Sequence, residues 1–294
     1  MSILFDTKYM KINIISPQDN KFTQIIGTID KSPQKFYFIG KLPEKRIPAV
    51  AIVGTRKPTA YGREVTYQIA YDLAKRGIVI ISGMALGVDG IAHKACLDAG
   101  GTTLAVLGNG VDIIYPASHR DLAKNIINSG GAILSEYEPG TEARDFHFLQ
   151  RNRIVSGLSD AIIITEAAIR SGTLSTAAHA LEQGREVFVV PGNITSPLSA
   201  GCNKLIKQGA HPITCADDIL EVIAPDLLQG QALLPLGNTP LESKIIGLLQ
   251  SGIRDGDELQ TLSEVSASEF STAITMMEIS STIRALGGNQ WTLR

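Results

Sequence analysis

The sequence has few aromatic residues, few cysteines and little net charge. Aromatics make up 5% of the 294 residues, three cysteines lie far apart, and the formal net charge is −2. Because no two cysteines have CxxC spacing, neither a disulfide framework nor a metal site is predicted. No apolar run approaches the roughly 20 residues of a membrane-spanning helix, and no signal-peptide pattern is present. We therefore expect a cytoplasmic protein without a cofactor, a metal or a membrane contact.

Aliphatic residues and glycine are plentiful. Hydrophobic residues reach 44%, and there are 28 glycines. From residue 49 onward, short apolar runs alternate with longer amphipathic stretches, which is typical of repeated βαβ units. This pattern predicts an α/β fold, an extended Rossmann-like, doubly wound and mainly parallel sheet. The predicted strands are 50–54, 78–82, 103–107, 132–135, 161–165, 186–190 and 212–214, and the predicted helices are 62–76, 88–99, 118–128, 149–158, 173–183 and 202–208.

Composition and charge divide the chain. Residues 1–48 carry a net charge of +4, residues 49–214 carry +1, and residues 215–294 carry −7. Since the C-terminal end is acidic, any polyanion has to be bound by the earlier segments. We predict four parts: a short N-terminal extension with an edge strand at residues 1–46, a Rossmann-like domain at 47–224, a linker at 225–238, and an acidic, winged-helix-like domain of three helices and a hairpin at 239–294. The last predicted helix is 269–286.

The first strand is followed by Gly54, Thr55 and Arg56, and then by a helix. In a parallel sheet this turn lies at the carboxyl edge, where the helix N-terminus directs N–H groups at anions. The guanidinium of Arg56 adds a planar cation suited to phosphate. We predict an anion-binding turn here.

Later turns repeat this arrangement. The candidate ligand residues are Ser82, Gly83, Gly87, Ser171, Gly172, Thr173, Asn203 and Lys204, to which a helical segment adds Phe148, Arg151, Asn152 and Arg153. Asp89 is a candidate helix cap, or one of a metal pair with His93 that lacks a third ligand. Because Arg151 and Arg153 are two residues apart, they cannot share a helix face. One is expected to face the ligand edge, and the other to meet a carboxylate such as Glu136 or Glu166.

The order of these motifs resembles the DprA/Smf family of bacterial DNA-processing proteins. The runs that carry the resemblance are GTR, SGMALGVDGIAH, GNGVDIIYP, RNRI, SGTLSTAAHALEQGR, VFVVPG and SAGCNKLIKQGA. The resemblance implies a non-catalytic, homodimeric protein that binds single-stranded DNA and loads the RecA recombinase during natural transformation. Many members also carry a longer helical N-terminal domain, of which we expect no counterpart here.

Position by position, the resemblance makes Arg56 a phosphate contact and Phe148 an aromatic near the bases. Some members have a basic residue three positions before that aromatic. Here Asp145 stands there, with Arg144 beside it as the candidate substitute. The family also places its dimer interface at the end of the Rossmann domain, which gives the candidates Ile219, Leu220, Val222 and Ile223.

Two other functions are open to a fold of this kind. The sequence also resembles phosphoribohydrolases, in which case Glu166 would work with Arg151 or Arg153 in acid–base and phosphate chemistry. The double-glycine turn of those enzymes is absent, and Ser171 and Gly172 stand in its place. A dinucleotide-binding oxidoreductase is not favoured, because no GxGxxG follows the first strand. The acidic domain is either a protein-contact or autoinhibitory surface, or a stabilising appendage.

Overall fold

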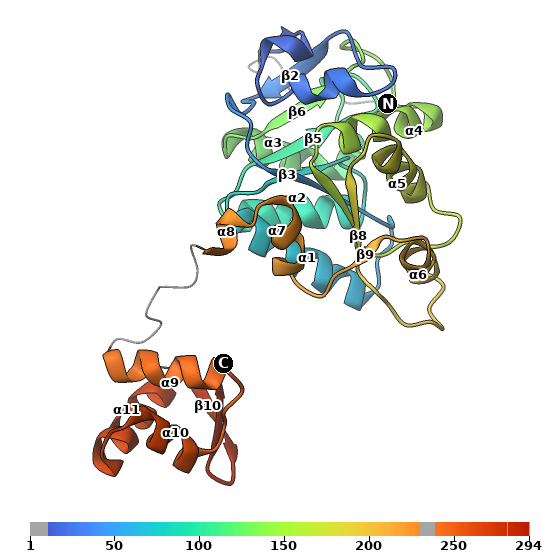
Figure 1. Ribbon diagram of the computed structural model, residues 1–294. Helices are drawn as coiled ribbons and strands as arrows, with labels where there is room; N and C mark the ends of the chain where they lie inside the picture. Colours follow the sequence, from blue (N-terminus) through green and yellow to red (C-terminus); the bar gives the residue numbers. More distant parts are fainter. Residues whose placement is uncertain (1–10, 230–238, 281, 294) are drawn as a thin grey trace. The chain divides into compact units, whose positions relative to one another are not determined.

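The computed structural model describes residues 11–229, 239–280 and 282–293 (Figure 1). The chain separates into two compact units, residues 1–228 and 229–294. Part of the predicted linker, residues 230–238, lies outside the described residues. Within the described ranges, no helix combines the length and apolarity that crossing a bilayer would need.

The first unit is built on one nine-stranded sheet. The order across the sheet is β1 (Asn13–Ile15), β2 (Phe36–Gly40), β6 (Ala132–Ser135), β5 (Thr103–Val106), β4 (Val79–Ser82), β3 (Ala49–Val53), β7 (Ala161–Ile164), β8 (Glu186–Val189) and β9 (His211–Pro212). All neighbours from β6 across to β9 pair in parallel, whereas β2 pairs antiparallel with both β6 and β1.

Helices cover both faces of this sheet (Figure 1). Strand β3 is buried along its whole length, and its alternate residues enter separate cores: Val50 and Ile52 on one face, Ala51 and Val53 on the other. This division follows from the two-residue period of a strand. The face of Val50 packs against α1 (Ala60–Lys75), α2 (Val88–Asp98) and α7 (Asp217–Ile223), and the face of Val53 packs against α4 (Asp145–Gly157), α5 (Thr173–Glu182) and α6 (Ala200–Lys207). Helix α3 (Arg120–Asn128) lies over β5 and β6.

The doubly wound, mainly parallel sheet is confirmed, and several local predictions are corrected. The N-terminal extension supplies two strands, of which β1 lies at the edge of the sheet and β2 lies between β1 and β6. Two 3₁₀ turns, η2 (Pro17–Asp19) and η3 (Gln24–Thr28), lie between β1 and β2. Helix α4 begins at Asp145, earlier than predicted, so Phe148 lies in its first turn.

The candidate dimer residues at α7 divide into buried and exposed ones. Ile219 and Leu220 have no exposed surface and belong to the unit's own core, so the prediction that they form an interface is wrong. Ile223 packs partly against the same core, whereas Val222 is 47% exposed. The apolar side of this short helix therefore packs against the core of its own unit. Helix α8 (Asp226–Gln229) follows it, inside the segment predicted as linker.

The second unit contains three helices and a hairpin with a core of their own. They are α9 (Pro240–Gln250), α10 (Gly256–Ser263), α11 (Ala267–Ile279) and the antiparallel strands β10 (Ile283–Gly287) and β11 (Gln290–Leu293). These are the elements expected of a winged-helix-like module. The predicted helix 269–286 is too long, because it ends at Ile279 and its last residues form β10.

Glu166, just beyond β7, ties together the elements that surround the carboxyl edge. Its backbone oxygen accepts a hydrogen bond from Thr55 N at 2.8 Å. Its buried carboxylate accepts from Thr59 N at 2.8 Å and from Thr59 Oγ1 at 2.7 Å, and Thr59 Oγ1 in turn caps α1 by accepting from Gly62 N. A Cβ at Gly62 would lie 2.3 Å from the carboxylate, so a larger residue there would displace the Glu166 side chain. The negative charge at the start of α1 also complements the helix dipole.

Replacing Glu166 by Ala should lower the free energy of unfolding by about 1–3 kcal/mol, because Thr59 N–H loses its acceptor and the start of α1 loses its anchor. Urea unfolding followed by circular dichroism measures the change. Glu182→Ala, at an exposed position on α5, is the control and should shift stability by less than about 0.5 kcal/mol. Equal stability of the two variants would contradict this role for Glu166.

Candidate nucleic-acid interface

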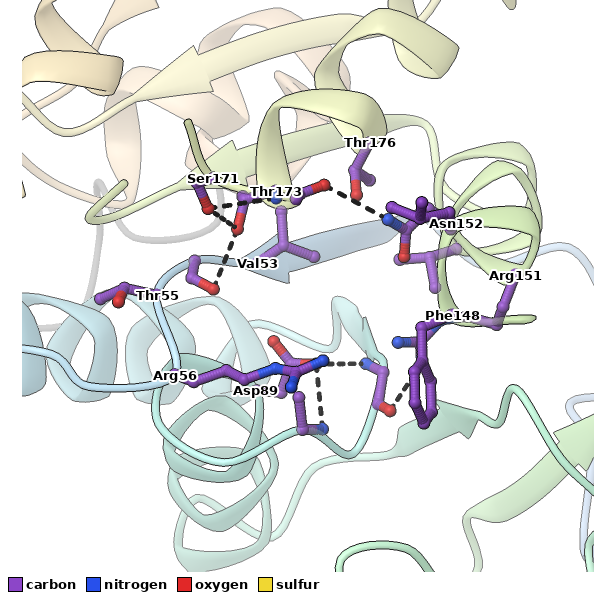
Figure 2. Close-up of a pocket in the computed structure, with 16 residues that line it drawn as sticks. Val53, Thr55, Arg56, Asp89, Phe148, Arg151, Asn152, Ser171, Thr173 and Thr176 are labelled. Carbon is purple, nitrogen blue, oxygen red and sulfur yellow. Dashed lines mark hydrogen bonds between the residues drawn. The ribbon is translucent and has the colours of Figure 1, made fainter. Parts of the chain in front are cut away.

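A pocket of about 240 Å³ lies at the carboxyl edge of the sheet. It is bounded by the ends of β3 and β4, the start of α5 and one face of α4 (Figure 2). Ten of the sixteen candidate residues line it: Gly54, Thr55, Arg56, Gly83, Phe148, Arg151, Asn152, Ser171, Gly172 and Thr173. The topology therefore brings together turns that are more than a hundred residues apart.

The backbone of the turn after β3 is held by neighbouring residues, whereas the guanidinium of Arg56 has no ion pair among the described residues. Thr55 O accepts a hydrogen bond from Val88 N, and a Cβ on Gly54 would lie 2.6 Å from Val88 Cγ2. Arg56 is exposed, and its guanidinium carbon lies 5.7 Å from the centre of the Phe148 ring. Across the described parts of the chain, no carboxylate forms an ion pair with Arg56. The anchored turn therefore presents an uncompensated positive charge beside an aromatic face.

Two buried side chains clamp the backbone of Gly83 in the loop after β4, one at its N–H and one at its carbonyl. Asp89 Oδ2 accepts from Gly83 N and from Ala85 N, each at 3.1 Å. Arg151 Nη1 donates to Gly83 O at 2.5 Å and also to Val106 O. Burial raises the pKa of Asp89, which the Arg151 charge and the two N–H donors oppose, and burial lowers the pKa of Arg151. The two side chains hold the loop in place (Figure 2).

Several candidates in and around this loop have structural roles. Arg151 is only 5% exposed, so most of its donor capacity serves backbone carbonyls, although its Nε has no partner and the side chain still lines the pocket. Ser82 is fully buried and its hydroxyl donates to Ile52 O, which corrects the prediction that it cradles phosphate. Gly87, at φ +78°, does not line the pocket. A Cβ there would lie 2.4 Å from Thr55 O, so glycine is needed for the close approach to the Arg56 turn.

The start of α5 brings hydroxyl groups to the opposite wall. Thr173 Oγ1 donates to Gly54 O at 3.0 Å and accepts from Ser171 Oγ at 3.0 Å. Thr173 N donates to Ser171 Oγ, and the next two N–H groups donate to the carbonyls of Ser171 and Gly172. The expectation that the first-turn N–H groups are free is therefore wrong. An anion in the pocket would meet the positive end of the helix dipole and the hydroxyls of Ser171 and Thr173. Thr176, about one turn further along the helix, adds a third hydroxyl to this wall.

Helix α4 presents one face to the pocket. Phe148, Arg151, Asn152 and Val155 follow the spacing of a single helix face and all line the pocket. Asn152 Nδ2 donates to Ser175 Oγ at 2.9 Å, which joins α4 to the start of α5.

Arg153, two residues after Arg151, points away from the pocket, as the spacing predicts. Arg153 makes a bidentate pair with Glu136, at 2.9 Å and 2.7 Å, and both side chains are largely buried. The separation of Arg151 from Arg153 is confirmed, and Glu136 is the partner carboxylate. The prediction that Arg153 binds phosphate does not fit this pairing, because its charge is already neutralised.

The remaining candidates lie apart from the pocket. Arg144 is the exposed residue that precedes α4. Asn203 exchanges two hydrogen bonds with the backbone of Gly192, so its amide holds the turn after β8. Lys204 is exposed on α6 and does not line the pocket. The structure therefore has one central pocket in place of the predicted row of equivalent anion-binding turns, and Arg144 and Lys204 lie outside it.

The carboxylate that the hydrolase interpretation requires is not in the central pocket. Glu166 does not line the central pocket, and both of its carboxylate oxygens accept hydrogen bonds from Thr59. Nor do Asp89 and His93 form a metal pair. His93 is buried with Nδ1 2.6 Å from Thr103 Oγ1, and burial lowers its pKa to about 3. Among the described residues, no three His, Cys, Asp or Glu side chains are grouped as metal ligands would be.

Sequence reasoning left one side of the site unassigned. Tyr115, in the segment after β5, stacks on Phe148 with ring centres 5.6 Å apart. Together with Leu86 and Pro116 it lines a small hollow of about 60 Å³ next to the pocket, and Arg56 and Phe148 are among the residues that line both. The GNGVDIIYP run contains Tyr115, but nothing in the sequence places this ring beside Phe148.

The chain is similar to known DNA-processing proteins over most of its first unit. The chain matches the family model described as DNA recombination-mediator protein A over residues 13–224. It is 44% identical over 207 residues to Protein Smf of Escherichia coli, covering 70% of this chain and 55% of that protein. It is 45% identical over 194 residues to the putative DNA processing protein DprA of Mycobacterium tuberculosis H37Rv, covering 65% of this chain and 50% of that protein. The chain thus spans about half the length of these curated relatives.

Two solved structures have the same fold. DprA from Streptococcus pneumoniae superposes with a TM-score of 0.67 at 38% identity, over 72% of this chain and 75% of that one. DprA from Helicobacter pylori, whose structure is described for its single-stranded DNA binding mode, gives 0.65 at 32% identity, over 74% of this chain and 98% of that one.

The family model covers well over half of the sequence, and the resemblance seen in the motifs is confirmed: this chain belongs to the DNA recombination-mediator protein A (DprA/Smf) family.

Proposed function

We propose that this protein binds single-stranded DNA at the carboxyl edge of its sheet, protects incoming DNA, and delivers it to the RecA recombinase during natural transformation. The observation that carries the proposal is the exposed Arg56, without an ion pair among the described residues, over the face of Phe148 at the mouth of the central pocket. A cation attracts the phosphate backbone, and an aromatic face accepts any base. Because a duplex hides its base faces, this pair favours a single strand. The family description and the single-stranded DNA binding of the Helicobacter pylori relative support the same function.

The role is one of binding without covalent chemistry. The carboxylate that lines the pocket, Asp89, is buried and accepts hydrogen bonds from two N–H groups of the neighbouring loop. A general base has to reach a substrate proton directly or through one water, and Asp89 is committed to the backbone instead. We infer that the pocket positions nucleic acid.

Replacing Arg56 by Ala should weaken binding to a labelled oligothymidylate by about tenfold and reduce the dependence of log Kd on log salt by about one ion. Fluorescence anisotropy across a salt series measures both. Lys75→Ala is the control, because it removes an equal charge from the opposite end of α1. Unchanged affinity and salt slope in Arg56→Ala would reject the site. The mediator role further requires that Arg56→Ala fail to promote RecA assembly on single-stranded DNA.

The arginine paired with Glu136 should behave differently. Arg153→Ala leaves a largely buried carboxylate without its partner and should lower the free energy of unfolding by about 2 kcal/mol. The salt slope of DNA binding should stay at the wild-type value, because Arg153 contacts no phosphate in this proposal. Urea unfolding and anisotropy on the same preparation separate the two effects. A lower salt slope with unchanged stability would mean that Arg153 contacts DNA phosphate and would contradict this proposal.

The protein is also inferred to act as a homodimer through the end of its first unit. Val222 on α7 and Leu227 on α8 are exposed apolar residues there. Val222→Asp should shift the sedimentation coefficient from dimer toward monomer, since it places a charge in an apolar contact. Ile14→Asp is the control, because Ile14 is exposed on edge strand β1. A dimer that persists in Val222→Asp would place the contact elsewhere.

A further inference from the structure

The Tyr115 ring is stacked and exposed at the same time. Its centre lies 5.6 Å from that of Phe148, with 25° between the ring planes, and 49% of the residue remains exposed. Within the described parts of the chain, its hydroxyl makes no hydrogen bond. By contrast, the hydroxyls of Tyr61, Tyr67 and Tyr137 each donate to a neighbouring residue. Contact with Phe148 orients Tyr115, and one side of the ring is left open.

The surroundings of Tyr115 suit a base better than a phosphate. The hollow it lines is apolar on one side, through Leu86, Pro116 and Phe148, and cationic on the other, through Arg56. Leu86 is itself half exposed. Of the described residues around this hollow, none is acidic. Apolar walls with a nearby cation fit the flat face of a nucleobase and the charge of its backbone.

The two sides of the site differ in chemistry. Toward α5 the walls carry the hydroxyls of Ser171, Thr173 and Thr176, as backbone phosphate and sugar would need (Figure 2). Toward β5 they carry the two stacked rings. Phe148 has Tyr115 and the guanidinium of Arg56 as neighbours, and Tyr115 adds a second, half-exposed aromatic face beside it.

We propose that Tyr115 is a second base-stacking residue, which holds the nucleotide next to the one at Phe148. The inference rests on the proposed single-stranded DNA binding and deepens it. Two successive bases then lie over the ends of β4 and β5, while the phosphates run past Arg56 toward the start of α5. Because the two rings are neighbours, the strand follows a defined path across the carboxyl edge.

The test uses the full chain and short oligothymidylates that carry one 2-aminopurine at successive positions. Stacking on an aromatic ring quenches this base. Tyr115→Leu keeps apolar bulk and removes the ring, and should weaken binding about 5- to 20-fold, the usual effect of losing one stacked base. Tyr115→Phe should bind like wild type. The matched control is Tyr67→Leu, because Tyr67 is also a partly exposed ring stacked on a second aromatic, Tyr71, outside the pocket.

The quenching pattern separates stacking from mere support of Phe148. Tyr115→Leu should restore fluorescence at one probe position, and Phe148→Leu should restore it at the adjacent one. Restoration at the same position in both variants, or wild-type affinity in Tyr115→Leu, would overturn the inference. If Arg56→Ala weakens binding while Tyr115→Leu does not, the proposed function stands and this inference alone fails. If neither variant weakens binding, the site itself is wrong.

Discussion

The clamp that Asp89 and Arg151 form on the backbone of Gly83 is the interaction on which the rest of the site depends. Asp89 accepts from the Gly83 N–H and Arg151 donates to the Gly83 carbonyl, so the two successive peptide groups that flank this Cα are fixed by buried charges from different helices. Taking two charges out of water is costly unless they compensate each other and satisfy backbone groups. Here they do both. The clamp holds the loop after β4 against α4, and this loop lines the same pocket as Arg56 and Phe148.

Burial decides which of the three arginines around the pocket can meet a ligand. Arg151 is enclosed and serves backbone carbonyls, while Arg153 is neutralised by Glu136. Arg56 sits on a turn pinned by Thr55 and has an aromatic ring as its neighbour. The exposed cation of the three is therefore the one at the mouth of the pocket. Such a local charge attracts a phosphate backbone even though the whole chain is close to neutral.

Much of the fold could be predicted from periodicity. The parallel strands from β3 to β8 were predicted to within a residue or two, because runs such as AVAIV are buried on both faces and end at turn residues. Errors arose where a boundary depends on contacts. The start of α4 could not be placed because Phe146 and Phe148 show no helical period by themselves, and the end of α11 depends on the pairing of β10 with β11.

Local spacing and a count of charges were sufficient for the sheet, the turns at its carboxyl edge, the acidic character of the second unit and the opposite orientation of Arg151 and Arg153. They could not tell which polar groups remain available to a ligand, because that depends on partners distant in the chain. Ser82, Asn203 and Glu166 have the right chemistry for a ligand, yet their hydrogen-bonding groups are taken up by other parts of the fold. The role proposed for Tyr115 could not be predicted for the same reason, because only the folded chain brings its ring centre to 5.6 Å from that of Phe148.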